Sequence, residues 1–365
     1  MQNHFLLTCL GVALLAGCSA VDTVDFYWQG ATGQLDLLAR ARPIPEVIGE
    51  GSDPVLAARL GRVRDMRAFA SHELGLPDNA SYTRYTDLGR PFVLWNVFAA
   101  PPLSLKPRQW CFPVAGCVNY RGYFREDQAR AEAARIKTQG DDVQVSGVPA
   151  YSTLGWFDDP VLSSFVRWPE TEVARLIFHE LAHQLVYVKD DSAFNESFAT
   201  AVEEAGVARW LAAQRNPALD AQAVRSERLR TAFRALTRAA RARLVAVFAS
   251  DASDADKRRA KAETFADMKV AYEKAKAGEP GLAGYDRWFA QEPNNASLAA
   301  IGLYTDRVPA FRVLLLEQDH DLPRFYERVR TLAALPKPER DAMLAAAASR
   351  APQLAGAAGA APMQN

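Results

Sequence analysis

The chain is 365 residues long and carries 43 basic and 43 acidic side chains, so its formal net charge is zero. A neutral chain shows no bulk attraction to nucleic acid or to an anionic surface, and we expect no nucleic-acid partner. Hydrophobic residues make up 49% of the chain, which is typical of a globular protein with one large domain or two modest ones.

The N-terminus contains a short apolar run, residues 5–16, which ends in the sequence Leu15-Ala16-Gly17-Cys18. The run has the length of a signal peptide and is too short to cross a bilayer. Its end is similar to the bacterial lipobox, in which the chain is cut before the cysteine and the cysteine carries lipid. We therefore predict a signal peptide at residues 1–17 and membrane attachment through a lipid on Cys18. The serine that follows implies, by resemblance to Gram-negative lipoproteins, an outer-membrane protein that faces the periplasm.

Two cysteines remain once Cys9 has left with the signal peptide and Cys18 has been modified. They are Cys111 and Cys117, in the sequence CFPVAGC. An exported compartment permits disulfides, and this spacing can close a small loop, so we predict a structural disulfide. The alternative is a redox or metal-binding pair, but the CxxC spacing typical of such pairs is absent.

The first part of the mature chain changes from a helical to a β pattern. Residues 25–76 follow a helical pattern that is broken at Pro43 and Pro45. Residues 79–104 hold two runs rich in aromatic and β-branched side chains, which predict paired strands, and residues 117–124 continue the β character.

Residues 125–140 then predict an alanine-rich helix, and residues 143–154 predict a strand. The tail is rich in Ala, Gly and Pro, and we expect it to be partly disordered. We divide the chain after the signal peptide into a helical and β region with the disulfide loop, a catalytic region and a low-complexity tail: residues 18–140, 141–340 and 341–365.

The sequence His179-Glu180-Leu181-Ala182-His183 is the motif around which we organise the chain. Two histidines four residues apart on a helix lie on one face, one turn apart, so both imidazoles can reach one zinc ion. Glu180 is not needed as a ligand and can pass a proton from a metal-bound water to a leaving amine. The plain alternative is a core helix with two hydrogen-bonded histidines.

A catalytic zinc ion takes three protein ligands and keeps one position for water. The HExxH motif is not followed by the glycine and third histidine of the HExxHxxGxxH pattern. Instead, Asp191 or Ser192 can cap a second helix, and Glu196 lies one turn into it. A tight hairpin between the two helices would return this carboxylate to His179 and His183. The alternative for Glu196 is an ordinary first-turn acid.

The run HELAHQ, followed closely by FNESFA, is similar to the gluzincins, the zinc peptidases with a glutamate ligand. More broadly, the chain resembles a bacterial family described as putative aminopeptidases. The stretches that carry this resemblance are Trp110–Phe124, Gly147–Leu162, His179–Ala199 and Asn294–Phe311.

The resemblance implies a ligand set of His179, His183 and Glu196, with Glu180 as the general base. Many gluzincins have an aspartate four residues after the ligand glutamate, which orients the first histidine. The residue at that position here is Thr200. Glu203, on the same helix face, is the candidate for orienting His179 instead.

The resemblance also implies functions for three segments outside the two helices. The strand at residues 143–154 would hold the substrate backbone by strand addition, with an internal strand as the equal alternative. Tyr304 would donate to the oxyanion, with a core tyrosine as the equal alternative. A carboxylate usually grips the free amine in aminopeptidases. Asp158 and Asp159 are candidates for it, although Asp-Asp-Pro also reads as a turn.

The sequence from 218 to 277 predicts a long helical hairpin with a series of arginines, which we interpret as a solvated face rather than a phosphate-binding surface. Together these features predict an α+β, mostly α, gluzincin-like zinc peptidase, with a small sheet beside the HExxH helix. The expected activity is zinc-dependent hydrolysis of peptides by an aminopeptidase. The alternatives are an envelope endopeptidase or quality-control protease, and a non-catalytic zinc-binding lipoprotein.

Overall fold

The computed structural model describes residues 25–51, 53–112, 116–305 and 307–359, with the backbone alone for residues 303–305 and 351–359. The predicted signal peptide and Cys18 lie outside the described residues. In the part of the chain that is described, no helix combines the length and apolar character needed to cross a membrane.

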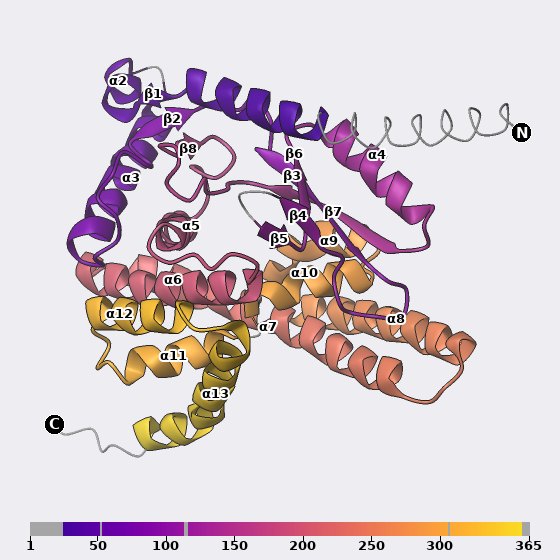
Figure 1. Ribbon diagram of the computed structural model, residues 1–365. Helices are drawn as coiled ribbons and strands as arrows, with labels where there is room; N and C mark the ends of the chain where they lie inside the picture. The colour runs from indigo at the N-terminus through magenta and orange to yellow at the C-terminus, as the bar shows by residue number, and fades with distance from the viewer. Residues whose placement is uncertain (1–24, 52, 113–115, 306, 360–365) are drawn as a thin grey trace, which may run out of the picture.

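The protein is α+β and mostly helical, as predicted (Figure 1). The first described segment, residues 25–39, is a helix that runs along one side of the molecule. The helices that follow are α2 (Ile44–Gly49), α3 (Pro54–His72), α4 (Glu126–Lys137), α5 (Glu170–His183), α6 (Ser192–Gln214), α7 (Pro217–Ala249), α8 (Asp254–Gly278), the 3-10 helix η1 (Pro280–Tyr285), α9 (Asp286–Ala290), α10 (Asn295–Thr305), α11 (Val308–Leu316), α12 (Leu322–Ala333) and α13 (Lys337–Gly359).

The strands are short and form three small sheets. They are β1 (Arg42–Pro43), β2 (Arg84–Thr86), β3 (Leu94–Ala100), β4 (Trp110–Phe112), β5 (Gly116–Val118), β6 (Arg121–Tyr123), β7 (Asp142–Val148) and β8 (Val161–Leu162). The sheets have the orders β1-β2-β8, β6-β3-β7 and β4-β5. The prediction that the two runs in residues 79–104 pair with each other is wrong. β2 pairs with β1 and β8, whereas β3 pairs with β6 and β7, because glycine and proline between the two runs redirect the chain.

The β6-β3-β7 sheet is covered on one face by α4 and over part of the other by α10. β7 is an edge strand of this sheet among the described residues. It ends at Val148, six residues before the predicted end of the strand. Pro149 follows immediately and has no N–H to donate to a ladder, which is consistent with the early end.

Helix α5 lies in the interior, packed between α3 and α6. Its buried residues recur at helical spacing, among them Val173, Ile177 and Leu181, so the helix presents a continuous apolar face. α6 approaches closely at Gly206, where a Cβ atom would lie 2.8 Å from the rings and methyls of Phe178 and Leu74. This close contact fixes the relative position of the two helices that carry the motif residues.

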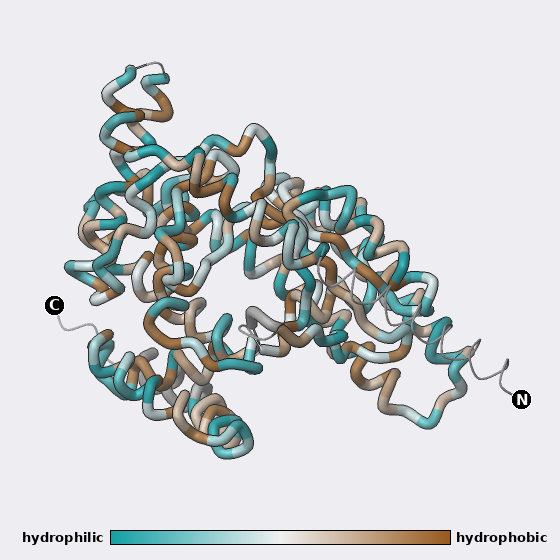
Figure 2. The backbone as a smooth tube through the Cα atoms, turned by 45° about the horizontal axis from the view of Figure 1, so that its top comes forward, coloured by the Kyte–Doolittle hydropathy of each residue, from teal (hydrophilic) through white to brown (hydrophobic). Residues whose placement is uncertain are grey.

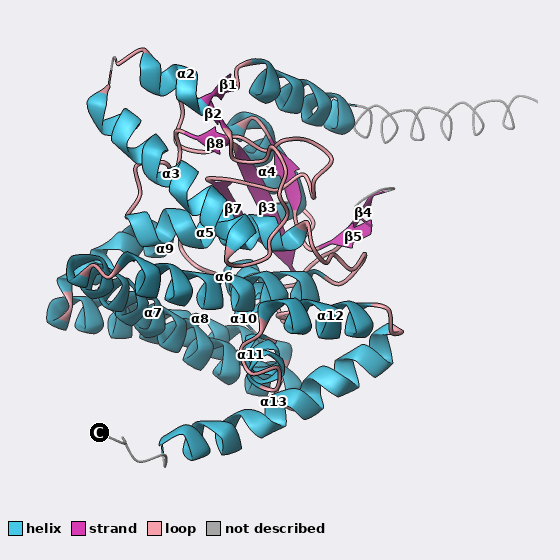
Figure 3. Cartoon of the chain, turned by 90° about the vertical axis from the view of Figure 1, so that its left-hand side faces the viewer, coloured by secondary structure: helices cyan, strands magenta, loops and turns pink. Residues whose placement is uncertain are grey.

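The predicted long hairpin is formed by α7 and α8, which extend together to one side of the molecule (Figures 1 and 3). Hydrophobic and hydrophilic residues alternate along its two helices (Figure 2). Several of its arginines are ion-paired: Arg230 contacts Glu172 of α5 at 2.7 Å, and Arg243 contacts Asp267 at 2.6 Å.

Helices α11, α12 and α13 form a layer against α6. The expectation of a partly disordered tail is wrong for residues 345–359, because α13 continues to Gly359. Alanine is the strongest helix former, and Leu344 and Ala347 are buried against the core, so both propensity and packing favour the helix.

Candidate metal centre

Two neighbouring helices carry the motif residues. α5 ends at His183, so His179 and His183 occupy its last turns on one face. α6 begins after Asp191, whose side chain accepts a hydrogen bond from the backbone N–H of Phe194 and thereby caps the helix as predicted. Glu196 lies in the second turn of α6 and therefore faces the end of α5.

The ligand atoms of His179, His183 and Glu196 all lie within 4.8 Å of one another. The two Nε2 atoms are 3.1 Å apart, and the Glu196 Oε2 atom lies 3.3 Å from His179 Nε2 and 3.8 Å from His183 Nε2. Two nitrogens bound tetrahedrally to one zinc ion at ordinary bond lengths would be separated by about 3.3 Å. The donor types and their spacing therefore fit a zinc ion.

The other nitrogen of His179 is held from behind. Its Nδ1 atom lies 2.9 Å from Glu203 Oε2, and the second oxygen of Glu203 accepts a hydrogen bond from Arg175 at 3.0 Å. This contact leaves Nε2 as the nitrogen that faces Glu196. Glu203 thus has the position expected of the residue that orients the first histidine, whereas Thr200 is a buried residue of the same helix.

The carboxylates of Glu196 and Glu203 make the site favourable for a cation. Burial lowers the pKa of His179, but hydrogen bonds with Glu196 and Glu203 raise it well above its ordinary value. Burial, together with the nearby charge of His179, lowers the pKa of His183 to about 4 against the opposing charges of Glu196 and Glu203, so this imidazole is neutral at physiological pH, the form that binds a metal. Its Nδ1 atom has no hydrogen-bond partner among the described residues.

Glu180 lies beside these ligands and lines the same cavity. Its carboxylate forms no hydrogen bond with any other residue that the structure describes. Burial, together with the nearby charges of Glu196 and Glu203, raises the pKa of its carboxyl group to about 7. A carboxylate with a pKa near the working pH is suited to accept and return a proton.

The loop between α5 and α6 is held by contacts that the sequence did not predict, although it did predict the cap at Asp191. The Asn195 amide accepts from Val188 N and donates to Val188 O, both at 2.8 Å. Asp191 is buried and binds Arg340 at 2.8 Å and Arg307 at 3.3 Å. The place of Asn195 directly before Glu196 in FNESFA was the feature of the sequence that could have indicated its supporting position. The partners of Asp191 lie more than 100 residues away, and no local pattern indicates them.

The centre opens into a cavity of about 600 Å³. Strand β3 contributes Leu94 and Asn96 to its lining, and β7 contributes Val148. The segment after β7 adds Ala150 and Tyr151. The predicted substrate strand thus borders the cavity at its C-terminal end.

The remaining predicted residues take different places. Asp159 is buried and accepts hydrogen bonds from Thr153 N at 3.0 Å and Thr153 Oγ1 at 2.8 Å, so it organises a turn. Asp158 is exposed, and neither acid lines the cavity. Tyr304 belongs to α10, but its side chain lies outside the described residues, and its role stays a prediction.

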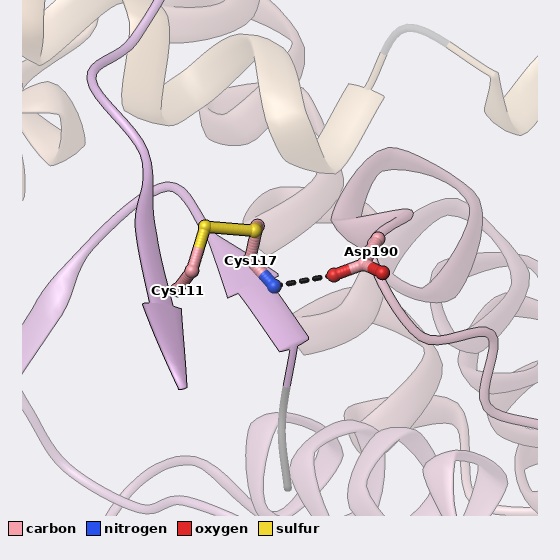
Figure 4. Close-up of a disulfide and its surroundings, with 3 residues drawn as sticks. All are labelled: Cys111, Cys117 and Asp190. Carbon is pink, nitrogen blue, oxygen red and sulfur yellow. Dashed lines mark hydrogen bonds between the residues drawn. A yellow bond between two sulfur atoms is a disulfide. The ribbon is translucent and has the colours of Figure 1, made fainter. Parts of the chain in front are cut away.

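Cys111 and Cys117 are joined by a disulfide that links β4 to β5 (Figure 4). The backbone N–H of Cys117 donates to the Asp190 carboxylate, in the loop between α5 and α6. The disulfide hairpin is therefore attached to the loop between the two helices that carry the motif residues.

The fold and the site together define a helical α+β protein with a largely buried donor set of two histidines and a glutamate. The chain belongs to the family described as Putative aminopeptidase, whose model matches residues 25–344. No curated protein and no solved structure matches the chain. Membership of this family supports a peptidase with a peptide substrate.

Proposed function

We propose that the protein is a zinc-dependent peptidase in which Glu180 acts as the general base. The observation that carries the proposal is the convergence of His179 Nε2, His183 Nε2 and a Glu196 oxygen within 4.8 Å, beside an unpaired carboxylate. A structural zinc site usually has four protein ligands and has no use for such a base.

His179, His183 and Glu196 would hold the zinc ion. When bound, zinc polarises the scissile carbonyl and lowers the pKa of water, which makes water a nucleophile at neutral pH. Glu180 takes the proton from the attacking water and donates it to the departing amine. The contact with Glu203 keeps the His179 ring in place.

The substrate backbone would lie along the edge formed by β7 and the residues that follow it. Val148, Ala150 and Tyr151 line the cavity beside the ligands, and β7 is an edge strand of its sheet among the described residues. An extended peptide can add to such an edge through main-chain hydrogen bonds.

A second candidate, an endopeptidase, is favoured by one observation. Among the described residues that line the cavity, the carboxylates are those of Glu180 and Glu196, and both already have a function. An aminopeptidase usually needs a further carboxylate for the free amine. Rates on a peptide with a free amine and on its N-acetylated form separate the two candidates, because only an aminopeptidase requires the amine.

We also propose that the protein is attached to the outer membrane by a lipid on Cys18 and faces the periplasm. The support is the lipobox-like end of residues 5–16. Metabolic labelling with palmitate, compared with the Cys18→Ser variant, tests the modification. Membrane fractions from labelled cells test the location.

The test of the mechanism compares Glu180→Gln with the wild type in zinc content and peptide hydrolysis. We expect one zinc per chain in both proteins and a loss of rate of about 10²-fold or more in the variant. Glu170→Gln, at the other end of α5, is the matched control and should keep both properties. Unchanged hydrolysis in Glu180→Gln removes the general-base role, and zinc without hydrolysis in the wild type favours the non-catalytic alternative.

A further inference from the structure

The cavity has an aromatic side that does not come from the catalytic helices. Phe26 and Tyr27 project from the helix at residues 25–39, and Phe112 projects from β4 of the disulfide hairpin. We call these three side chains the aromatic wall. It lines the same cavity as His179 and Glu180.

The rings of the aromatic wall contact one another. Phe26 and Phe112 stack with ring centroids 5.4 Å apart, and Tyr27 meets Phe112 edge-on at 6.3 Å. The Arg121 guanidinium lies 4.1 Å from the centroid of the Phe26 ring. These contacts hold Phe26 and Phe112 as one surface, so their positions are not independent.

The helix that carries Phe26 and Tyr27 is attached to the sheet. The Gln29 amide donates to Gly122 O at 3.3 Å and accepts from Phe124 N at 2.9 Å, so it pairs with the free edge of β6 as a strand would. Phe112 is held by the neighbouring disulfide and by the bond from the hairpin to the loop after α5 (Figure 4). Both supports fix the wall relative to the zinc ligands.

The wall is accessible to a ligand. Tyr27 is 44% exposed, and Phe26 and Phe112 are half-buried, so the rings are not filled core positions. The cavity of about 600 Å³ has room for several peptide residues. No arginine or lysine is among the described residues that line it, whereas Glu180 and Glu196 are. An acidic side chain would therefore find no cationic side chain to pair with among the lining residues.

On the basis of the proposed peptidase function, we propose that the aromatic wall binds an aromatic or large aliphatic side chain of the peptide next to the scissile bond. The substrate class is then peptides with a bulky apolar residue at this position. Small residues leave the rings uncovered, and acidic residues find no cationic partner among the lining residues. Burial of such a side chain against the rings supplies the binding free energy that distinguishes it from alanine.

The experiment measures kcat/KM on matched peptides that carry Phe, Leu, Ala or Glu at the varied position. Tyr27→Ala and Phe112→Leu change the wall without opening the core. We expect each to lower kcat/KM about tenfold on the Phe and Leu peptides, with little change on the Ala peptide. Trp28→Ala is the matched control, because Trp28 is the next residue on the same helix, 69% exposed, and does not line the cavity.

A binding measurement separates this inference from the peptidase function. Calorimetry of the Phe and Ala peptides with the Glu180→Gln variant reports binding without turnover. Weaker binding of the Phe peptide when Tyr27→Ala is added supports the wall, even if the wild type hydrolyses nothing and the peptidase proposal fails. Equal losses on the Phe and Ala peptides, in hydrolysis or in binding, would overturn the wall as a specificity subsite.

Discussion

The two sides of the cavity are built from different kinds of sequence. The catalytic side comes from α5 and α6, where the ligands and Glu203 all lie within residues 179–203 and are largely buried. The aromatic wall comes from residues 26, 27 and 112, which are remote from the motif in sequence and remain partly exposed. Both sides depend on tertiary contacts, but the ligands come from two helices that follow each other in the chain, whereas the wall joins segments far apart in sequence. Substitutions in α5 and α6 should therefore change hydrolysis, and substitutions in the aromatic wall should change the side-chain preference, independently of each other.

The largest effect is expected from removal of a ligand. Glu196→Ala takes one of three donors from the site, so zinc should no longer bind stoichiometrically and hydrolysis should fall to background. Atomic absorption and a peptide assay measure the two quantities. Chelation of the wild type should reproduce the loss, and added zinc should restore activity. An Ala variant that keeps zinc and activity would show that Glu196 is not a ligand.

Loss of the buried Asp191 should reduce stability more than any change to the wall. Asp191→Ala leaves Arg340 buried without its partner and removes the cap of α6, which we expect to lower the free energy of unfolding by about 3–5 kcal/mol. Denaturant titration measures the change. Asp53→Ala is the matched control, because Asp53 also caps a helix but is half-exposed and pairs with the exposed Arg167, so its loss should cost much less. Similar losses in the two variants would contradict this difference.

Because Asp191 is ion-paired in the folded protein, we also expect the free energy of unfolding to fall at acid pH. Burial raises the pKa of Asp191, but the hydrogen bond from Arg340 and the charges of Arg307 and Lys337 lower it below its ordinary 3.8. A lowered pKa means that the contribution to stability is complete above pH 3.8 and is lost as the pH falls through the folded-state value. Unfolding followed from pH 6 to pH 2 should show a steeper decline in the wild type than in Asp191→Asn. Parallel curves would rule out this linkage.

Glu203 tests whether the second carboxylate supports the catalytic side. Glu203→Gln keeps all three ligands but weakens the hold on His179 Nδ1, so zinc affinity should fall about 10–100-fold. Competition with a zinc chelator measures the affinity. Glu204→Gln, on the next residue, removes a pairing with Arg312 and should leave zinc affinity unchanged. Equal affinities of Glu203→Gln and the wild type would exclude the orienting role.

The smallest predicted change concerns the support of the aromatic wall. A Cβ atom on Gly33 would lie 2.2 Å from the Phe124 ring, so Gly33→Ala must displace that ring or the helix at residues 25–39, at a cost of about 1–3 kcal/mol. Gly30→Ala, on the same helix, meets nothing within 4 Å and should stabilise the helix by up to about 1 kcal/mol. Thermal unfolding compares them, and a stabilising Gly33→Ala would show that the helix is not tightly docked.

Local patterns in the sequence predicted the fold class, the α7–α8 hairpin, the cap at Asp191 and the helices around the HExxH motif. Local patterns do not show which remote strands pair, so the predicted pairing of β2 with β3 was wrong. The position of Glu203 followed from its place seven residues, about two turns, after Glu196. By contrast, Arg340 and the aromatic wall come from segments that share no pattern with the motif, and only the folded chain brings them to the loop after α5 and to the cavity.

The most direct test of the proposed zinc centre is X-ray absorption at the zinc edge, on protein loaded with one equivalent of zinc. We expect two imidazole nitrogens and a carboxylate oxygen at about 2.0–2.2 Å from the zinc ion, and the loss of one imidazole contribution in His183→Ala. A spectrum with sulfur ligands, or one unchanged by loss of His183, would show that zinc binds elsewhere and would contradict the proposed centre.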